Sequence, residues 1–419
     1  MQVTQSIEKS NGKGHLPAGA MDRRLKVLYV SFIPPTPAMG TAMTFYRHFI
    51  ERNDFDIKVI TNLNPFPFDS VPYEPVLFNP SRLTFRLFRT RLLPWVYGLH
   101  SLITHGRIPS SVWKAAKDFK PDFVFTVVAG WDYSILVAQR MARHLKVPLV
   151  VSFNDWFNYG WFPSHPLYHR RIEESFRRLY HECDLAFCTS EGMREALGPH
   201  PNAHVLYPTG GSMPDSVGPF EPYTGGTRPF VIGFGGSLAE WYGQMLERLV
   251  SAAQTQSAPV EFRFYGSNPN WTPDFAARAR GQNIFRGHLP FEQLQREMSQ
   301  VDALILPMGF EERCAFAERT SFKTKFLDYL SYQKPIFVWG PEYCTAVRVA
   351  REFDSAEICT DPKATAILER ILAVRSSPPR QVALVQNARR MYEDRFKPDK
   401  IHAGFLGQCR QLIMNRSAK

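Results

Sequence analysis

The sequence alternates short apolar runs with longer stretches of helical periodicity, and this alternation restricts the fold more than any other feature. The first run, residues 25–33, is rich in Val, Leu and Ile and is typical of a strand buried on both faces of a parallel sheet. Further strands are predicted at 55–61, 122–128, 148–153, 184–189 and 204–208, with helices near 41–52, 133–145, 167–182 and 191–197. This order predicts a doubly wound α/β sheet.

A second set of alternations follows a break in the pattern. Residues 208–229 are rich in Gly, Pro and Ser and have almost no apolar periodicity, which is typical of a linker. Strands are then predicted at 229–234, 260–265, 302–307, 335–340 and 355–360, with helices near 242–255, 290–300, 322–332, 342–351 and 361–374. We therefore predict two Rossmann-like α/β domains. The predicted boundaries are a disordered tail 1–23, a first domain 24–210, a linker 211–228, a second domain 229–390 and a helical segment 391–419.

Composition limits the class of protein. Six cysteines in 419 residues are too few for a disulfide scaffold, which favours a reducing, cytoplasmic location. No apolar run is long enough to span a bilayer, and residues 1–23 lack the apolar core of a signal peptide. The net charge of +11 is compatible with nucleic acid, an anionic membrane or a phosphorylated small molecule as partner. The basic residues are spread out and no nucleic-acid module is recognisable, so we expect no nucleic acid partner.

Residues 81–108 interrupt the alternation with a basic and aromatic segment. Four arginines interleave with large apolar residues: Arg82, Arg86, Arg89 and Arg91 with Leu83, Phe85, Leu87, Phe88, Leu92 and Trp95. One interpretation is a helical excursion packed on the first domain with solvated arginines. The alternative is a peripheral membrane contact, with Arg attracted to anionic lipid and Phe and Trp as anchors.

Two stretches of the second half carry candidate chemistry. Gly235, Gly236 and Ser237 follow its first strand and precede a helix whose free N–H groups could face an anion. Residues 318–340 place Arg319, Lys323 and Lys325 near the start of another helix, with Asp328 one turn further on. Cations at a helix start oppose the helix dipole, so a phosphate or diphosphate there would remove the conflict. Asp328 could accept hydrogen bonds from paired hydroxyls such as those of a ribose.

Other ligand motifs are missing from the sequence. The turn at 233–238 lacks the third glycine of a dinucleotide fingerprint, and no P-loop or hydrolase elbow occurs. No histidine, cysteine or acidic cluster has the spacing of a metal site, so we expect neither a metal nor a cofactor.

The stretch from Lys325 to Ile336, K-F-L-D-Y-L-S-Y-Q-K-P-I, resembles the K-x-x-E-Y-L-A-x-G-K-P-[VI] signature of glycosyltransferases with the GT-B fold. The resemblance is closest to the retaining group 1, or family 4, enzymes and extends over about residues 24–410. It implies two Rossmann-like domains facing across a cleft, with a C-terminal helix that returns to the first domain. It also implies transfer of a sugar, of the hexose type, from a nucleotide-diphosphate sugar to an acceptor hydroxyl. The acceptor would be a saccharide or a lipid-linked molecule, and the pathway would be polysaccharide, cell-envelope or glycolipid biosynthesis.

Site roles follow from this resemblance. Donor binding is expected at Gly235, Gly236, Ser237, Ser267, Arg319, Lys323, Lys325 and Asp328. Asp328 replaces the usual ribose-binding Glu of the family. The family's E-x7-E pair is absent, because the residue eight positions before Asp328 is Thr320. Candidates for the missing acid are Glu318, or Glu311 and Glu312 in a longer loop. Gly40 and Thr41 are expected on the acceptor side, and Asp132 and Asp155 follow two strands of the first half as candidate catalytic carboxylates.

The sequence is also compatible with two other functions. A sugar-nucleotide epimerase or a phosphorylase could use the same double-Rossmann plan. An epimerase should act on the donor alone, and a phosphorylase should need inorganic phosphate.

Overall fold

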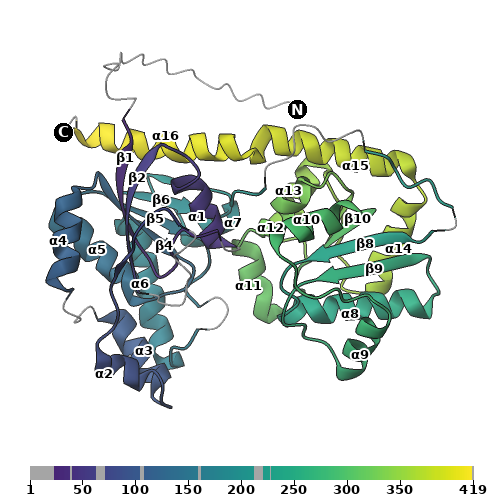
Figure 1. Cartoon of the computed structure of the whole chain (residues 1–419), viewed down its shortest axis with the longest axis horizontal. Coiled ribbons are helices and arrows are strands. Elements are labelled where there is room, and N and C mark those ends of the chain that lie inside the picture. The colour runs from purple at the N-terminus through teal and green to yellow at the C-terminus, as the bar shows by residue number, and fades with distance from the viewer. Residues whose placement is uncertain are drawn as a thin grey trace, which may run out of the picture.

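A computed structural model describes residues 23–37, 40–62, 71–103, 108–158, 162–211, 220–226 and 228–417. Residues 1–22 of the predicted disordered tail and half of the predicted linker, residues 212–219 and 227, lie outside these residues. The described parts form two α/β domains, each built on one parallel sheet (Figure 1). The predicted fold class is confirmed.

The first sheet has seven strands in the order β3-β2-β1-β4-β5-β6-β7. Its strands are β1 (Leu25–Val30), β2 (Phe55–Thr61), β3 (Val76–Leu77), β4 (Phe123–Val128), β5 (Leu149–Phe153), β6 (Leu185–Cys188) and β7 (Ala203–Val205). The helices are α1 (Thr41–Phe49), α2 (Arg82–Leu87), α3 (Leu93–Leu102), α4 (Ser110–Phe119), α5 (Tyr133–Leu145), α6 (His169–Glu182) and α7 (Glu191–Leu197), with a short 3-10 turn at Pro166–Tyr168. β1 lies inside the sheet, between β2 and β4, and its apolar side chains are buried on both faces.

The second sheet has five strands in the order β12-β11-β10-β8-β9. Its strands are β8 (Phe230–Gly235), β9 (Val260–Tyr265), β10 (Ala303–Pro307), β11 (Ile336–Trp339) and β12 (Glu357–Cys359). The helices are α8 (Glu240–Thr255), α9 (Pro273–Gly281), α10 (Phe291–Ser299), α11 (Glu312–Thr320), α12 (Thr324–Leu330), α13 (Thr345–Phe353), α14 (Ala364–Arg375) and α15 (Pro378–Met391). Each sheet is therefore parallel and flanked by helices, as the alternation predicted.

The chain then returns to the first domain. A π-helical turn, η3 (Tyr392–Phe396), separates α15 from the 20-residue helix α16 (Pro398–Ser417), which crosses to the first domain and runs along it (Figure 1). The sequence predicted a helical segment over 391–419, and within it Pro398, which has no N–H for a helix that continues through it, is the first residue of α16. The break places two helices at the junction instead of one.

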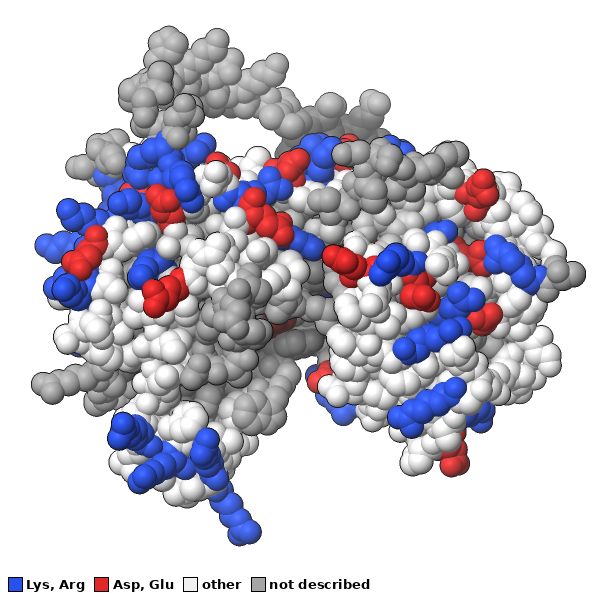
Figure 2. All heavy atoms as spheres, viewed as in Figure 1, with Lys and Arg blue, Asp and Glu red and all other residues white. Residues whose placement is uncertain are grey.

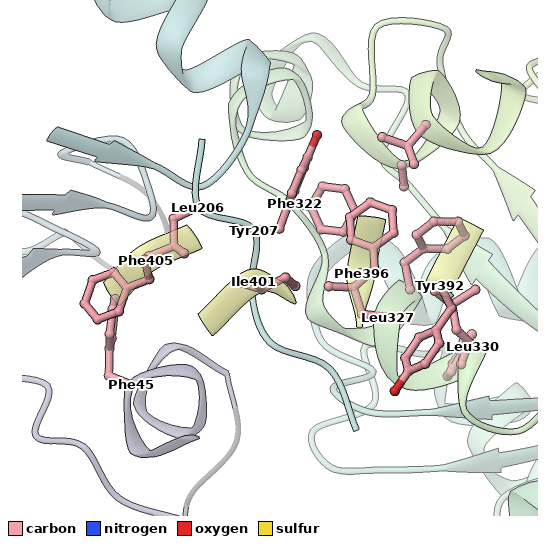
Figure 3. Close-up of a cluster of buried hydrophobic side chains, with 14 of the residues drawn as sticks. Phe45, Leu206, Tyr207, Phe322, Leu327, Leu330, Tyr392, Phe396, Ile401 and Phe405 are labelled. Carbon is pink, nitrogen blue, oxygen red and sulfur yellow. The ribbon is translucent and has the colours of Figure 1, made fainter. Parts of the chain in front are cut away.

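One apolar cluster links the two domains (Figure 3). Phe405 and Ile401 of α16 lie near Phe45 of α1 and Leu206, while Phe396 packs between Tyr207 and Phe322, with ring centroids 4.9 and 5.8 Å away. The core of the second domain thus continues through η3 and α16 into the first. Separating the domains here would expose these rings to water.

Candidate functional site

A cavity of about 450 Å³ lies between the two domains, at the carboxyl ends of their strands. The first domain contributes Gly40, Thr41, Arg47, Asn154, Asp155 and Thr189, and the second contributes Gly235, Gly236, Ser237, Glu240, Tyr242, Ser321, Lys323, Lys325 and Asp328, among others. We call this the donor cavity. Most of the predicted site residues line it.

The turn after β8 brings backbone close to a lysine. Gly236 has a φ of 139°, and its N–H donates to the carbonyl of Tyr265 at 2.9 Å. A Cβ at this position would lie 2.0 Å from Cε of Lys325. Glycine is therefore required both by the backbone conformation and by the lysine that crosses it. α8 begins four residues later and points its first N–H groups toward the same cavity.

Lys325 is partly buried and lies against aromatic rings in this cavity. Its ammonium lies 4.3 Å from the ring centroid of Tyr242 and 5.3 Å from that of Phe234. Among the described residues it makes no salt bridge with a carboxylate. Burial, aided by the neighbouring charge of Lys323, lowers the pKa of Lys325 to about 8. An anion in the cavity would stabilise the charged form.

Glu318 and Lys323 form a buried ion pair behind the cavity wall. Glu318 is fully buried, its Oε1 accepts from the N–H of Gly309 at 3.1 Å, and its Oε2 lies 3.2 Å from Nζ of Lys323. Lys323 itself lines the cavity, whereas Glu318 does not. Glu318 therefore neutralises one of the two lysines, so the predicted conflict of charge at the helix start remains only for Lys325. Glu318 is fully buried and does not line the cavity, so in this arrangement it does not reach a molecule bound there as a catalytic acid would.

Asp155 joins the two domains at the cavity. Its Oδ1 accepts a hydrogen bond from the hydroxyl of Ser321 at 2.7 Å, across 166 residues of sequence. Burial raises the pKa of Asp155, and the hydrogen bond and the nearby Lys323 oppose this rise. The carboxyl group of Asp155, in the loop after β5 of the first domain, therefore contacts the second domain through Ser321.

Asp328, on α12, also lines the cavity. Its Oδ1 accepts from the backbone N–H of Gly211 at 3.1 Å. Burial raises the pKa of Asp328, and the positive charge of Arg47, from α1 of the other domain, works in the opposite direction. A carboxylate and a guanidinium from different domains therefore lie on the same side of the cavity.

Four predicted site residues do not line this cavity: Asp132, Ser267, Glu318 and Arg319. Asp132 instead caps α5, with Oδ1 accepting from the N–H of Ser134 at 2.6 Å, and burial raises its pKa to about 7. Arg319 ends α11 rather than beginning α12, and its guanidinium lies 5.3 Å from the ring centroid of Tyr343. Ser267 is an exposed residue after β9, and its carbonyl accepts from Leu238.

The sequence reasoning did not single out Arg47, Asn154, Glu240 and Ser321, which also line the cavity. Asn154 could have been found, because it directly follows β5 and precedes Asp155. Arg47 stands in the middle of α1, and no local pattern distinguishes it from a solvated arginine. No group of three His, Cys, Asp or Glu residues suited to a metal occurs in the described part of the chain. Within the same ranges, no helix is long and apolar enough to cross a bilayer.

Known proteins share this arrangement. Residues 40–208, about two fifths of the chain, match the family model described as Glycosyltransferase Family 4. The sequence matches no curated protein. Similar solved structures include sucrose-phosphate synthase from Thermosynechococcus elongatus (13% identity, TM-score 0.63) and HepE of Anabaena in complex with UDP (13%, 0.59). A glycosyltransferase from Rickettsia africae is also similar (12% identity, TM-score 0.61). Each comparison covers 94% of this chain and 100% of the other.

The fold, with two parallel α/β domains facing across a cavity, is the GT-B fold, and together with the family match it defines the class of protein: a glycosyltransferase. Residues 40–208 match the model of Glycosyltransferase Family 4, the group whose signature the motif at 325–336 resembles. The expected fold and the general activity of a glycosyltransferase are therefore confirmed.

Proposed function

We propose that this glycosyltransferase uses a nucleoside-diphosphate sugar as donor, with the diphosphate bound between Lys325, the turn at Gly236 and the start of α8. The observation that carries the proposal is the ammonium of Lys325, which lies in the cavity over the rings of Tyr242 and Phe234 and makes no salt bridge with a carboxylate of the described residues. A departing diphosphate gains negative charge in the transition state, so a cation in this position stabilises it. HepE, one of the similar structures, contains UDP, which supports this choice of donor.

Other cavity residues complete the donor site in this proposal. Asp328 accepts hydrogen bonds from the ribose hydroxyls, and Gly40 and Thr41 lie on the acceptor side. Lys323 lies on the donor side of the cavity, with its charge balanced by Glu318. Asp155 orients the sugar or the acceptor hydroxyl from the first domain. We expect no metal to be needed, because lysines provide the positive charge.

A donor screen that measures released nucleoside diphosphate tests the proposal. UDP-, GDP- and ADP-sugars are offered to the enzyme together with saccharide acceptors. We expect release with one nucleotide class and a loss of about a hundredfold in Lys325→Ala and Asp328→Ala. Wild-type rates in both variants would show that the donor binds elsewhere. Conversion of the donor without an acceptor would favour the epimerase alternative, and a requirement for inorganic phosphate would favour the phosphorylase.

We further propose a retaining course of reaction. An inverting transfer needs a general base at the acceptor hydroxyl, whereas a retaining transfer needs leaving-group stabilisation and an oriented hydroxyl. No histidine occurs among the residues that line the donor cavity, and the carboxyl of Asp155 is already engaged by Ser321. Proton NMR of the fresh product compares its anomeric configuration with that of the donor. An inverted product would contradict the proposal.

The tip formed by α2 and α3 supports a peripheral membrane location, and thus a lipid-linked acceptor. Leu83, Phe85, Leu92, Trp95 and Leu99 are exposed there, and Leu83 and Phe85 are 68% and 51% exposed. No acidic residue occurs between residues 75 and 117, and the lower tip of the first domain shows only basic side chains in Figure 2. Exposed apolar anchors flanked by arginine fit an anionic lipid surface.

Vesicle sedimentation tests this location. We expect the protein to sediment with phosphatidylglycerol-containing vesicles but not with pure phosphatidylcholine vesicles. The double variant with Phe85→Ser and Trp95→Ser should no longer sediment with the vesicles that contain phosphatidylglycerol. The control is Phe316→Ser, an exposed phenylalanine on another face. Equal sedimentation of wild type and the double variant would exclude the tip as the contact. The predicted cytoplasmic location remains a prediction.

A further inference from the structure

A second cavity, of about 760 Å³, lies beside the donor cavity and also has walls from both domains. Its lining comes from the loop after β5 and α6 on one side, and from α8, Asn270 and α11 on the other: Trp156, Phe157, Asn158, Glu173, Arg177, Glu240, Trp241, Gln244, Asn270, Arg313, Cys314, Phe316 and Ala317. Glu240 lines both cavities. The second cavity is therefore a continuation of the cleft. Its volume is within the range of a small-molecule site.

Aromatic rings form part of its wall. The ring of Phe316 is 41% exposed, and its centroid lies 4.6 Å from that of Trp156 in an edge-to-face arrangement. Trp241 stands between the two cavities, because it lines this one and lies 5.9 Å from Nζ of Lys323 in the other. A large exposed ring is costly in water, and aromatic faces pack well against the C–H face of a pyranose.

Two polar groups of the cavity, the guanidinium of Arg177 and the carboxylate of Glu173, are planar and held in place. The guanidinium of Arg177 donates to Oε1 of Glu173 from Nε at 3.1 Å and from Nη2 at 2.9 Å, and from Nη1 to the carbonyl of Ala196 at 3.1 Å. It also lies 4.9 Å from the ring of Trp156. Fixed carboxylate and guanidinium groups can bind neighbouring hydroxyls without first losing side-chain entropy.

The charges in the cavity balance. The lining holds two acids, Glu173 and Glu240, and two arginines, Arg177 and Arg313, so its formal charge is zero. Arg313 also forms an ion pair with Glu311, which lies outside the lining. A polyanion such as a second diphosphate would find no net attraction there. An uncharged molecule with many hydroxyl groups fits this mixture of donors and acceptors.

The backbone at the boundary of the two cavities is strained. Glu240 has a φ of 55°, which is uncommon for a residue other than glycine. The side chain of Asn270 stabilises this conformation by donating from Nδ2 to the carbonyl of Glu240 at 3.1 Å. Such conformations persist where the surroundings enforce them, often at binding sites. Here the result is a carboxylate between the donor cavity and its continuation.

We propose that this second cavity binds an uncharged saccharide segment of the acceptor, beyond the sugar that receives the transferred residue. That the bound saccharide is the acceptor rests on the proposed function. That the cavity binds carbohydrate is independent of the proposed function. Phe316 stacks on a sugar ring, Arg313 and Gln244 bind its hydroxyls, and Glu240 contacts the sugar nearest to the donor. The enzyme thus selects an acceptor of at least two sugar residues.

A microarray of uncharged and charged oligosaccharides, probed with the full-length protein, tests this inference. We expect uncharged oligosaccharides to bind, and calorimetry with the strongest of them to show affinity about tenfold lower in Phe316→Ala and in Arg313→Ala. UDP affinity and melting temperature should stay at wild-type values in both variants. The matched controls are Phe85→Ala and Arg89→Ala, an exposed phenylalanine and an arginine far from the cavity.

Absence of oligosaccharide binding by the wild type, or unchanged affinity in both variants, would overturn the inference. Binding of charged glycans alone would contradict the proposal that the ligand is uncharged. Oligosaccharide binding without UDP binding would contradict the proposed donor but leave this cavity as a carbohydrate site, so the two failures are distinguishable.

Discussion

Lys325 is the residue whose ionisation most directly affects donor binding. Its folded pKa of about 8 means that the ammonium loses its proton as the pH rises above 8, and a neutral amine attracts a diphosphate less. We predict that the dissociation constant for UDP, measured by calorimetry, rises roughly eightfold between about pH 7.5 and pH 9. Lys325→Gln should bind weakly with no such dependence. The same rise in the variant would mean that another group titrates.

Gly236 allows Lys325 to occupy its position. A methyl group there meets the lysine side chain 2.0 Å away and requires a left-handed backbone that alanine adopts poorly. We predict that Gly236→Ala weakens UDP binding by about tenfold or more and lowers stability by about 1–2 kcal/mol. Gly281→Ala is the matched control, since nothing lies within 4 Å of its Cβ position. Unchanged UDP affinity in Gly236→Ala would place the diphosphate away from this turn.

His48 is a titratable residue at the contact between α1 and α16. Its Nδ1 lies 3.1 Å from Nδ1 of His402, and burial, with the charges of His402, Arg52 and Arg47, lowers its pKa. The unfolded chain therefore takes up more protons below about pH 6.5, so stability falls as the pH falls. We predict a loss of up to about 2 kcal/mol between pH 7.5 and pH 5. Urea unfolding of His48→Gln should show a smaller loss, and an identical loss would exclude His48.

Helix α16 ties the second domain to the first through its apolar side chains. Phe405 is buried and packs on Phe49, Phe55 and Phe187, with ring centroids 5.5, 5.6 and 5.0 Å away. We predict that Phe405→Ala costs about 3–5 kcal/mol of unfolding free energy, and that deletion of residues 400–419 lowers stability and activity together. Gln411→Ala, an exposed change in the same helix, should have little effect. A fully active truncated enzyme would contradict this role for α16.

The elements differ in how well the sequence predicted them. β1, β4 and β5 are buried on both faces, so their apolar runs are unambiguous in the sequence. Helix α11 was missed because it is short and largely polar, and its position depends on tertiary contacts such as that between Glu318 and Gly309. The error over Arg319 follows directly, since a helix that ends at Thr320 separates it from α12.

At the scale of the whole molecule, the sequence located one wall of the cavity better than the other. Lys325, Asp328 and Gly236 fall within local motifs of the second domain, and the fold brings them together. Arg47 and Ser321 act across the domain boundary, and only the relative position of the domains reveals them. The second cavity has the same origin, because Arg177 and Arg313 are far apart in sequence.

The arrangement of the two domains also relates the cleft to the basic tip. Helix α6 begins beside α3, where the rings of Trp95 and His165 stack 3.9 Å apart, and carries Glu173 and Arg177 into the second cavity. Figure 1 shows α2, α3, α8 and α11 on the side of the molecule opposite to α16. A lipid-linked saccharide held at the tip could therefore reach the cleft from that side.

A crystal structure of the enzyme with UDP tests the central claim most directly. The account predicts diphosphate oxygens within hydrogen-bonding distance of Nζ of Lys325 and of the backbone near Gly236, with the ribose at Asp328. A diphosphate bound outside the cavity between the domains, with no phosphate oxygen near Nζ of Lys325, would contradict it.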